Sequence, residues 1–223
     1  MTRLVLRKPG VLPYERSYEA MSAYTSQRNA QSEDEIWCLQ HPPVYTLGLA
    51  GKKEHVLDAG DIPLIASDRG GQVTYHGPGQ IVIYLLLDLK RRKLGVKNYV
   101  TVLEQAIIDY LVKLEVQAHR REGAPGVYVQ GSKIAALGIR VRRGCSYHGI
   151  ALNVNMDLTP FNGINPCGYP ELGVTQLAAF RAEQSIDTVA AGLVDELSKK
   201  LFPEGCTIIE KQGLCDTAAD NAA

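Results

Sequence analysis

The chain has 223 residues, of which 45% are hydrophobic, and its 24 lysines and arginines balance its 24 aspartates and glutamates. This composition is ordinary for a globular protein with a sizeable core, and a formal net charge of zero does not suggest nucleic acid or a membrane as a partner. The N-terminus lacks the apolar segment of a signal peptide and no long apolar run follows it, so we expect a cytoplasmic protein.

The five cysteines are odd in number and have no paired spacing, which is typical of a reducing compartment. The sequence contains none of the common cysteine and histidine spacings of metal sites, so we expect no metal.

Apolar periodicity predicts strands and helices in the following order. Short apolar runs predict strands at residues 4–6, 36–39, 44–47, 62–67, 73–75, 81–89, 116–119, 127–130, 133–142 and 147–156. Helical spacing predicts helices at residues 14 to about 29, 96–115 and 183–202. The run at 81–89 lacks polar alternation, so we expect a strand that is covered on both faces. Together these elements indicate an α+β fold with a mixed, largely antiparallel sheet and packed helices.

No composition shift or internal repeat marks a linker, so we expect residues 1–205 to form a single domain. Residues 206–223 end in small and acidic residues and are expected to form a flexible C-terminal tail. Residues 47–61 and 157–170 are rich in turn residues and predict long loops.

A glycine-rich stretch, RGGQVTYHGPGQ at residues 69–80, lies between two apolar runs. Its glycines allow positive φ angles and close backbone approach. His76 follows a short predicted strand, where its ring can face a ligand. The glycine spacing fits neither a dinucleotide-binding loop nor a P-loop, which argues against a phosphate site. The alternative interpretation is a hairpin with a solvated histidine.

Alternation along the strand predicted at 133–142 places Lys133, Ala135, Leu137, Ile139 and Val141 on one face. A lysine therefore begins an otherwise apolar row, and a partly desolvated lysine loses proton affinity. The alternative is a lysine at the start of a strand whose charged end reaches solvent.

Alternation along the strand predicted at 147–156 groups His148 with Ile150, Leu152, Val154 and Met156. The alternative to a functional His148 is a core histidine with satisfied hydrogen bonds. Small side chains on the two adjacent strands could leave a groove for an extended apolar ligand. These residues are Ala136, Gly138, Gly149 and Ala151.

Cys167 is the best candidate for a nucleophile, because it lies between Pro166 and Gly168 in a predicted loop. The other cysteines are Cys38 in a strand, Cys145 in a predicted hairpin turn, and Cys206 and Cys215 near the C-terminus. A single loop cysteine can equally lack any catalytic role, so its position alone does not decide the matter.

Three stretches together resemble the signature blocks of the lipoyl(octanoyl) transferases: RGGQVTYHGPGQ at 69–80, GSKIAALGIR at 131–140 and GINPCG at 163–168. The resemblance implies a fold related to the catalytic domain of lipoate and biotin protein ligases, and a single octanoyltransferase domain over residues 1–205. It also implies that Cys167 is the acyl-accepting nucleophile and that Lys133 activates it. The implied acyl site consists of Arg69, Gly70, Gly71, Gln72, Val73, Thr74, Tyr75, His76, Ala136, Leu137, Gly138, Gly149, Ile150 and Ala151.

The resemblance further implies a reaction without a cofactor. The donor would be octanoyl-acyl carrier protein, and the acceptors would be lipoyl domains of 2-oxoacid dehydrogenases and the glycine cleavage H protein. Backbone N–H groups of the Gly70-Gly71 turn or of the Cys167-Gly168 turn would stabilise the tetrahedral oxyanion. Three alternatives stay open: an ATP-dependent lipoate or biotin ligase, a thioesterase or cysteine hydrolase, and a non-catalytic module that binds an acyl carrier.

Overall fold

The computed structural model describes residues 2–166, 172–182 and 184–214. A seven-stranded sheet has the order β10-β1-β2-β6-β9-β8-β7 and a three-stranded sheet has the order β4-β3-β5. The large sheet contains β1 (Thr2–Val11), β2 (Asp34–Gln40), β6 (Gln80–Leu86), β7 (Val127–Val129), β8 (Ser132–Arg142), β9 (Cys145–Asn153) and β10 (Cys206–Lys211). The small sheet contains β3 (Val44–Leu47), β4 (Leu64–Ala66) and β5 (Val73–His76).

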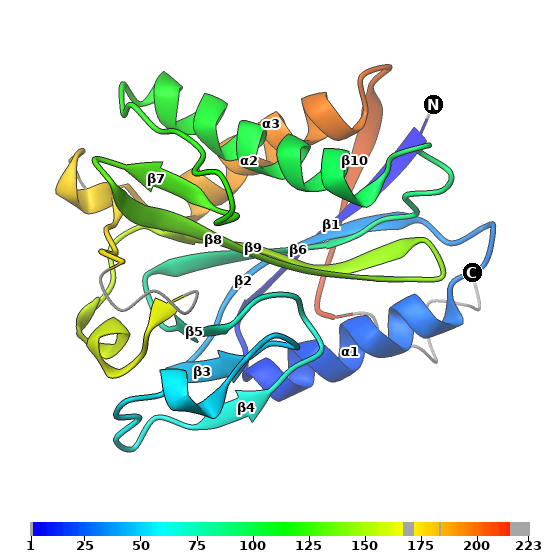
Figure 1. The fold of residues 1–223 in the computed structure, drawn as a ribbon. Coiled ribbons are helices and arrows are strands. Elements are labelled where there is room, and N and C mark those ends of the chain that lie inside the picture. The colour runs from blue at the N-terminus through cyan, green and yellow to red at the C-terminus, as the bar shows by residue number, and fades with distance from the viewer. Residues whose placement is uncertain (1, 167–171, 183, 215–223) are drawn as a thin grey trace.

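The large sheet is covered on both faces (Figure 1). Helices α2 (Val96–Lys113) and α3 (Ile186–Leu201) lie on one face, and α1 (Tyr14–Gln27) lies on the other beside the small sheet. β1 pairs in parallel with β10 and β2, whereas the remaining neighbours in this sheet are antiparallel. The expected α+β class with a mixed, largely antiparallel sheet is therefore confirmed.

The position of β6 between two cores explains why its sequence is apolar without alternation. Ile81, Ile83 and Leu85 face the core beneath α2 and α3. Val82 and Tyr84 face the second core, which α1 closes with Met21. Both faces are buried, so the strand has no exposed side on which polar residues would be favoured, and the expected two-sided burial is confirmed.

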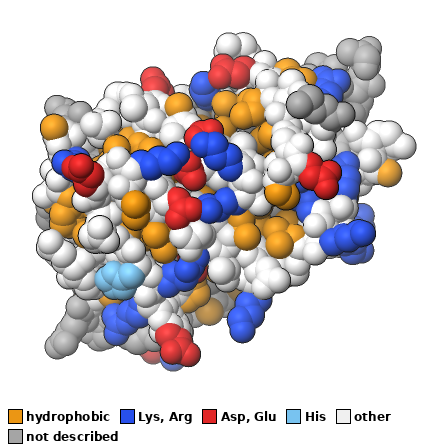
Figure 2. Space-filling model, turned by 90° about the horizontal axis from the view of Figure 1, so that it is seen from above, with side chains coloured by type: hydrophobic (Ala, Val, Ile, Leu, Met, Phe, Trp, Pro, Cys, Tyr) orange, Lys and Arg blue, Asp and Glu red, His pale blue; other side chains and the backbone are white. Residues whose placement is uncertain are grey.

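The helical face of the molecule has no single sign of charge. Basic and acidic side chains are interspersed where α2 and α3 are seen from above (Figure 2). Some of them pair between the helices: Lys200 contacts Asp109 at 2.5 Å, and Lys113 pairs with Glu196. None of the helices in the described part of the chain has the length and apolarity needed to cross a membrane.

The expectation of a tail beginning at residue 206 is wrong for residues 206–211. These residues form β10, which pairs in parallel with β1 from Thr2↔Cys206 to Arg7↔Lys211. β10 is a half-exposed edge strand, so its stability comes mainly from backbone hydrogen bonds and its sequence needs no buried apolar row. The small and acidic residues at the end of the chain therefore do not indicate the structure of residues 206–211.

The strand expected at residues 116–119 is also not formed. After α2 the chain passes through Glu115 at φ 57°, and in this segment only His119 makes an isolated bridge, to Tyr128. Val116 is buried against the core without joining the sheet. Its apolar character reflects that contact and does not indicate a strand.

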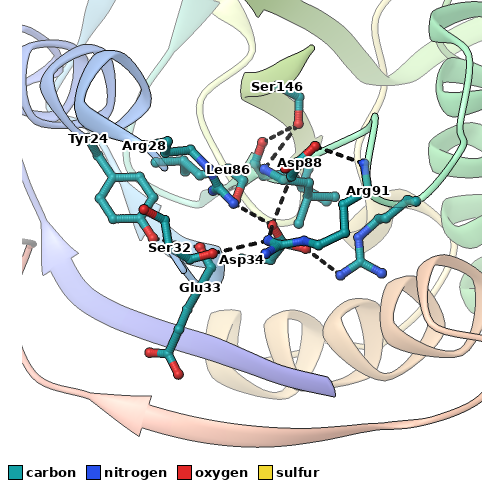
Figure 3. A network of polar contacts seen from close by, with 12 residues as sticks. Tyr24, Arg28, Ser32, Glu33, Asp34, Leu86, Asp88, Arg91 and Ser146 are labelled. Carbon is teal, nitrogen blue, oxygen red and sulfur yellow. Dashed lines mark hydrogen bonds and ion pairs between the residues drawn. The ribbon is translucent and has the colours of Figure 1, made fainter. Parts of the chain in front are cut away.

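A buried carboxylate joins α1, β2 and the turn after β6 (Figure 3). Asp34 is 1% exposed, and its side chain accepts hydrogen bonds from Arg28 at 2.6 Å, Arg91 at 2.8 Å and Arg92. The N–H of Asp88 donates to the same carboxylate at 2.8 Å. Burial alone would raise the pKa of Asp34, but the arginines and this N–H outweigh it and hold the pKa below its usual value.

Replacing Asp34 with Asn is expected to lower the free energy of unfolding by about 3–5 kcal/mol, because it leaves clustered guanidinium groups without their shared anion. Urea denaturation followed by circular dichroism measures the effect. The matched control is Glu33→Gln, which removes partly exposed ion pairs with Arg3 at 2.9 Å and Lys211 at 3.7 Å and should cost at most about 1 kcal/mol. Equal effects of the two substitutions would contradict a structural role for the Asp34 cluster.

Candidate active site

A cavity lies between the large sheet, the segment that leads into β5, and the start of α1. Its wall includes Tyr14 of α1 together with residues of β5, β6, β8 and β9. Gly138 and Gly149 pair directly across β8 and β9. Both positions require glycine because of close packing: a Cβ at Gly138 would lie 3.0 Å from Arg69 Cδ, and a Cβ at Gly149 would clash with the Ile83 carbonyl of β6.

Most residues that the resemblance assigns to the acyl site line this cavity. They are Arg69, Gly71, Gln72, Val73, Thr74, His76, Ala136, Leu137, Gly138, Gly149, Ile150 and Ala151. Gly70 and Tyr75 lie outside the wall. The Gly70 N–H donates to the Ile139 carbonyl at 3.0 Å, and Tyr75 packs against Tyr45 and Phe161. Cys167 lies outside the described residues.

Lys133 lines the cavity because of a β-bulge. Tyr128 pairs with Lys133 but Val127 pairs with Ala135, so Ile134 is one extra residue in β8. Ile134 and Ala135 both face the helical core, and the bulge places Lys133 on the same face as Ala136. The expectation that Lys133 shares a face with Ala135 is therefore wrong, whereas Ala135 and Leu137 do contact the same core.

The Lys133 side chain is held in a fixed place and does not extend to solvent, since it is only 5% exposed. Its Nζ donates to the Pro125 carbonyl at 2.9 Å and lies 5.3 Å from the centroid of the Tyr128 ring. Gly126 allows this approach, because a Cβ there would lie 2.8 Å from Lys133 Cε and its φ is +144°. The interpretation of Lys133 as a solvent-reaching lysine is wrong.

Arg69 shapes the cavity through the backbone. Its guanidinium donates to the carbonyls of Thr46 at 2.6 Å, Gln72 at 2.7 Å and Gly70 at 2.8 Å. A Cβ on Gly138 would lie 3.0 Å from Arg69 Cδ. Arg69 therefore ties the 69–72 segment to the small sheet while packing against Gly138 of β8.

A chain of hydrogen bonds links His76 to the strand that carries Lys133. Gln80 Nε2 donates to Asn153 Oδ1 at 2.9 Å, so Gln80 Oε1 is left to accept from His76 Nδ1 at 2.6 Å. Asn153 Nδ2 donates to the Thr175 carbonyl at 2.9 Å, and the Thr175 N–H donates to the Lys133 carbonyl at 3.0 Å. This bonding assigns the His76 proton to Nδ1.

Burial keeps two histidines of this region neutral. It lowers the pKa of His76 to about 3 and that of His41 to about 4. His41 Nδ1 donates to the Leu12 carbonyl at 2.6 Å, so Nε2 accepts from the Tyr84 hydroxyl at 2.7 Å. His41 thereby fixes Tyr84, a residue of the cavity wall.

His148 does not share a face with Ile150 and Leu152, contrary to the expectation from alternation. Its φ of 59° is in the left-handed region, and its ring stacks on Tyr18 of α1 at a centroid distance of 5.5 Å. The core on the opposite face contains Ile150 and Leu152. His148 Nε2 bonds Asp68 Oδ1 at 2.9 Å, and burial lowers the pKa of His148.

Sequence reasoning missed several residues of the wall. These are Tyr14, Gln80, Val82, Tyr84, Asn153, Phe161, Pro166 and Val174. One signal was present: Gln80, Val82 and Tyr84 alternate along β6, and a polar residue begins this otherwise apolar row. Phe161 and Val174 come from separate loops, and no local pattern places them beside the sheet. Within the described ranges, no group of three or more acidic, histidine or cysteine side chains could hold a metal ion.

The neutral histidines predict a pH dependence of stability. The unfolded chain protonates these histidines near pH 6.5, whereas the folded chain protonates them only near pH 3 to 4. Their contribution is therefore complete above pH 6.5 and is lost as the pH falls toward 4, by up to about 1.4 kcal/mol per pH unit for each histidine. Urea denaturation at several pH values between 7 and 4.5 should show this slope.

The double variant His41→Gln/His76→Gln should flatten that slope, and the exposed His119→Gln should leave it unchanged. A slope that is the same in the double variant and the wild type would contradict the burial of neutral histidines.

Comparison with known proteins identifies close relatives. The model of the lipoyl protein ligase A/B catalytic domain family matches residues 13–198. An octanoyltransferase of Thiobacillus denitrificans is 54% identical over 199 residues, which cover 89% of this chain and 91% of that protein. An octanoyltransferase of Shewanella sp. (strain W3-18-1) is 54% identical over 213 residues, which cover 96% of this chain and 97% of that protein.

Solved structures share the fold at low sequence identity. The putative lipoate protein ligase Ta0514 from T. acidophilum with bound lipoic acid has a TM-score of 0.76 at 18% identity, covering 96% of this chain and 90% of that chain. Biotin protein ligase from Aquifex aeolicus in complex with biotin and ATP has a TM-score of 0.58 at 15% identity, covering 90% and 71%. The expected relation to the ligase fold is confirmed. Given the family match and two relatives of 54% identity over nearly their whole length, this chain belongs to the octanoyltransferases of the lipoyl protein ligase A/B catalytic domain family.

Proposed function

We propose that this enzyme moves an octanoyl group from octanoyl-acyl carrier protein to a lysine of a lipoyl domain, through a thioester on Cys167. The acceptors would be the lipoyl domains of 2-oxoacid dehydrogenases and the glycine cleavage H protein. One observation carries the proposal: a buried lysine, Lys133, lines the same cavity as Pro166, the residue that precedes Cys167 in sequence. Octanoyl transfer agrees with the names of the relatives.

In the first step, the Cys167 thiolate attacks the carbonyl carbon of the donor thioester. A new bond from carbon to Cys167 Sγ forms, the bond to the carrier sulfur breaks, and the released carrier thiolate takes up a proton from the Lys133 ammonium, which leaves Lys133 neutral. Because one thioester replaces another, the step needs no ATP. A nearby ammonium favours the thiolate form of a cysteine, which is the role proposed for Lys133.

In the second step, the amine of the acceptor lysine attacks the acyl-Cys167 thioester. An amide bond forms, Cys167 leaves as a thiolate, and the proton of the amine passes to a base. Lys133, in its neutral form, is proposed as that base. The chain of hydrogen bonds through Gln80 and Asn153 supports this assignment indirectly, because it gives His76 a structural task in place of proton transfer.

Both steps pass through a tetrahedral oxyanion that needs hydrogen-bond donors. The Gly70 N–H already donates to the Ile139 carbonyl at 3.0 Å, so it is not free for this role. The candidates that remain are the backbone N–H groups of Gly71, Cys167 and Gly168.

Intact mass spectrometry after incubation with octanoyl-acyl carrier protein tests the proposal. Wild type should gain one octanoyl adduct that hydroxylamine removes and that apo lipoyl domain discharges. Cys167→Ser should gain no hydroxylamine-sensitive adduct, and Lys133→Ala should acylate at least about 100-fold more slowly, within the range typical for loss of a general acid or base. The matched control Lys97→Ala removes an exposed lysine of α2 and should behave like wild type.

Three results would contradict this mechanism. Full octanoylation of the lipoyl domain by Cys167→Ser would exclude the covalent intermediate. A strict need for ATP and free octanoate would indicate a ligase, and release of octanoate without an acceptor would indicate a hydrolase.

A further inference from the structure

A buried glutamate lies near Lys133, on the helix that packs against its strand. Glu104 belongs to α2, which contacts β7 and β8, and it is only 6% exposed. A carboxylate is costly to bury without partners. One of its oxygens accepts from Arg120 Nε at 3.1 Å, and the other accepts from the Gly126 N–H at 3.0 Å. Glu104 therefore has one partner close to the surface and one inside the protein.

The Gly126 N–H and the carbonyl that holds Lys133 belong to the same peptide unit. The Pro125 carbonyl accepts from Lys133 Nζ at 2.9 Å, and the bond from Pro125 to Gly126 carries both this carbonyl and the Gly126 N–H. A peptide unit is planar, so the direction of its N–H fixes the direction of its carbonyl. Glu104 therefore sets the orientation of the group to which Lys133 donates.

The backbone by itself restrains this peptide unit weakly. Gly126 has a φ of 144°, and glycine lets a peptide plane turn more easily than any residue with a Cβ. No larger residue fits, because a Cβ on Gly126 would lie 2.8 Å from Lys133 Cε and 2.9 Å from the Ala135 carbonyl. The approach of Lys133 thus requires a glycine, and the hydrogen bond to Glu104 supplies the restraint that glycine lacks.

The polarity of the arrangement is consistent along the peptide unit. The Glu104 carboxylate faces the N–H, which is the positive end of the peptide dipole, and Lys133 Nζ donates to the negative end. Hydrogen bonds to an ionised acceptor are stronger than those between neutral groups, and buried hydrogen bonds that share a polar group strengthen one another. The bond to Glu104 therefore makes the Pro125 carbonyl a better acceptor for Lys133.

We propose that Glu104 is a positioning residue for acyl transfer: it fixes the peptide unit between Pro125 and Gly126 and so holds Lys133 Nζ where it acts on Cys167. This inference rests on the proposed function, in which Lys133 activates the nucleophile and transfers the proton. Glu104 does not line the acyl cavity, so its effect on the reaction passes through Lys133 and not through contact with the acyl chain.

The test measures single-turnover acylation by octanoyl-acyl carrier protein in wild type, Glu104→Met, Lys133→Ala and the double variant. Methionine has a similar length and suits a helix, but it offers the Gly126 N–H only a weak acceptor. Glu104→Met should lower the maximal rate about 10- to 100-fold, as expected when a reacting group is slightly misplaced. The half-saturating donor concentration should stay within about 2-fold of wild type. The double variant should be within about 2-fold of Lys133→Ala, because nothing is then left for Glu104 to position.

Two further substitutions at the same site test the hydrogen bond itself. Glu104→Gln keeps an oxygen that can accept from the Gly126 N–H, so its rate should stay within about 5-fold of wild type. Glu104→Asp keeps the charge but is one methylene shorter, so it should be as slow as Glu104→Met. It also provides the same comparison if Glu104→Met does not fold.

The matched control is Glu196→Met on α3. Glu196 is 5% exposed and pairs with Lys113 and Lys199, so its replacement also removes a buried carboxylate from a helix. It should leave the acylation rate unchanged, because Glu196 has no contact with the peptide unit that holds Lys133.

Three results would overturn the inference. Losses that multiply in the double variant would show that Glu104 acts independently of Lys133. Equal losses in Glu104→Gln and Glu104→Met would show that the hydrogen bond to Gly126 is not the cause. A wild-type rate in Glu104→Met, with Lys133→Ala slow, would reject the positioning role alone. If Lys133→Ala acylated at the wild-type rate, or wild type gained no adduct, the proposed function itself would fail.

Discussion

Two-sided burial of β6 is the constraint on which the rest of the fold depends. Its alternate side chains belong to two separate cores, so the large sheet must be covered on both faces. Helices α2 and α3 complete one cover, and α1 with the small sheet provides the other (Figure 1). Gly138 and Gly149, which pair across β8 and β9, line the acyl cavity on the face that the second cover closes, and Arg69 packs against Gly138 there.

A single extra residue in β8 places a lysine on the wall of the acyl cavity. Without the bulge at Ile134, strict alternation would place Lys133 with Ala135 in the helical core, where an ammonium would be costly to bury. With the bulge, the lysine lies on the cavity wall and donates to a backbone carbonyl. The same strand pair therefore supplies both an apolar wall and one buried lysine.

The polar residues around the cavity serve mainly to position one another. Arg69 bonds to backbone carbonyls, and His76 is linked through Gln80 and Asn153 to the segment beside Lys133. Such a network rigidifies a site when its members are satisfied. It also joins the small sheet to the large one, so the cavity wall and the two sheets are stabilised together.

The sequence by itself determined the fold class and most strands and helices, because periodicity is a local signal. Its small residues indicated part of the cavity wall at Ala136, Gly138, Gly149 and Ala151, and the resemblance to the lipoyl(octanoyl) transferases supplied most of the remaining wall. The residue pattern singled out Lys133 and Cys167 and the resemblance implied their roles, although Cys167 lies outside the described residues. Only the tertiary structure decided which way Lys133 and His148 face, since a bulge and a positive φ each break the alternation. It likewise decided that residues 206–211 form an edge strand and that Phe161 and Val174 reach the cavity, because these contacts join segments far apart in the chain.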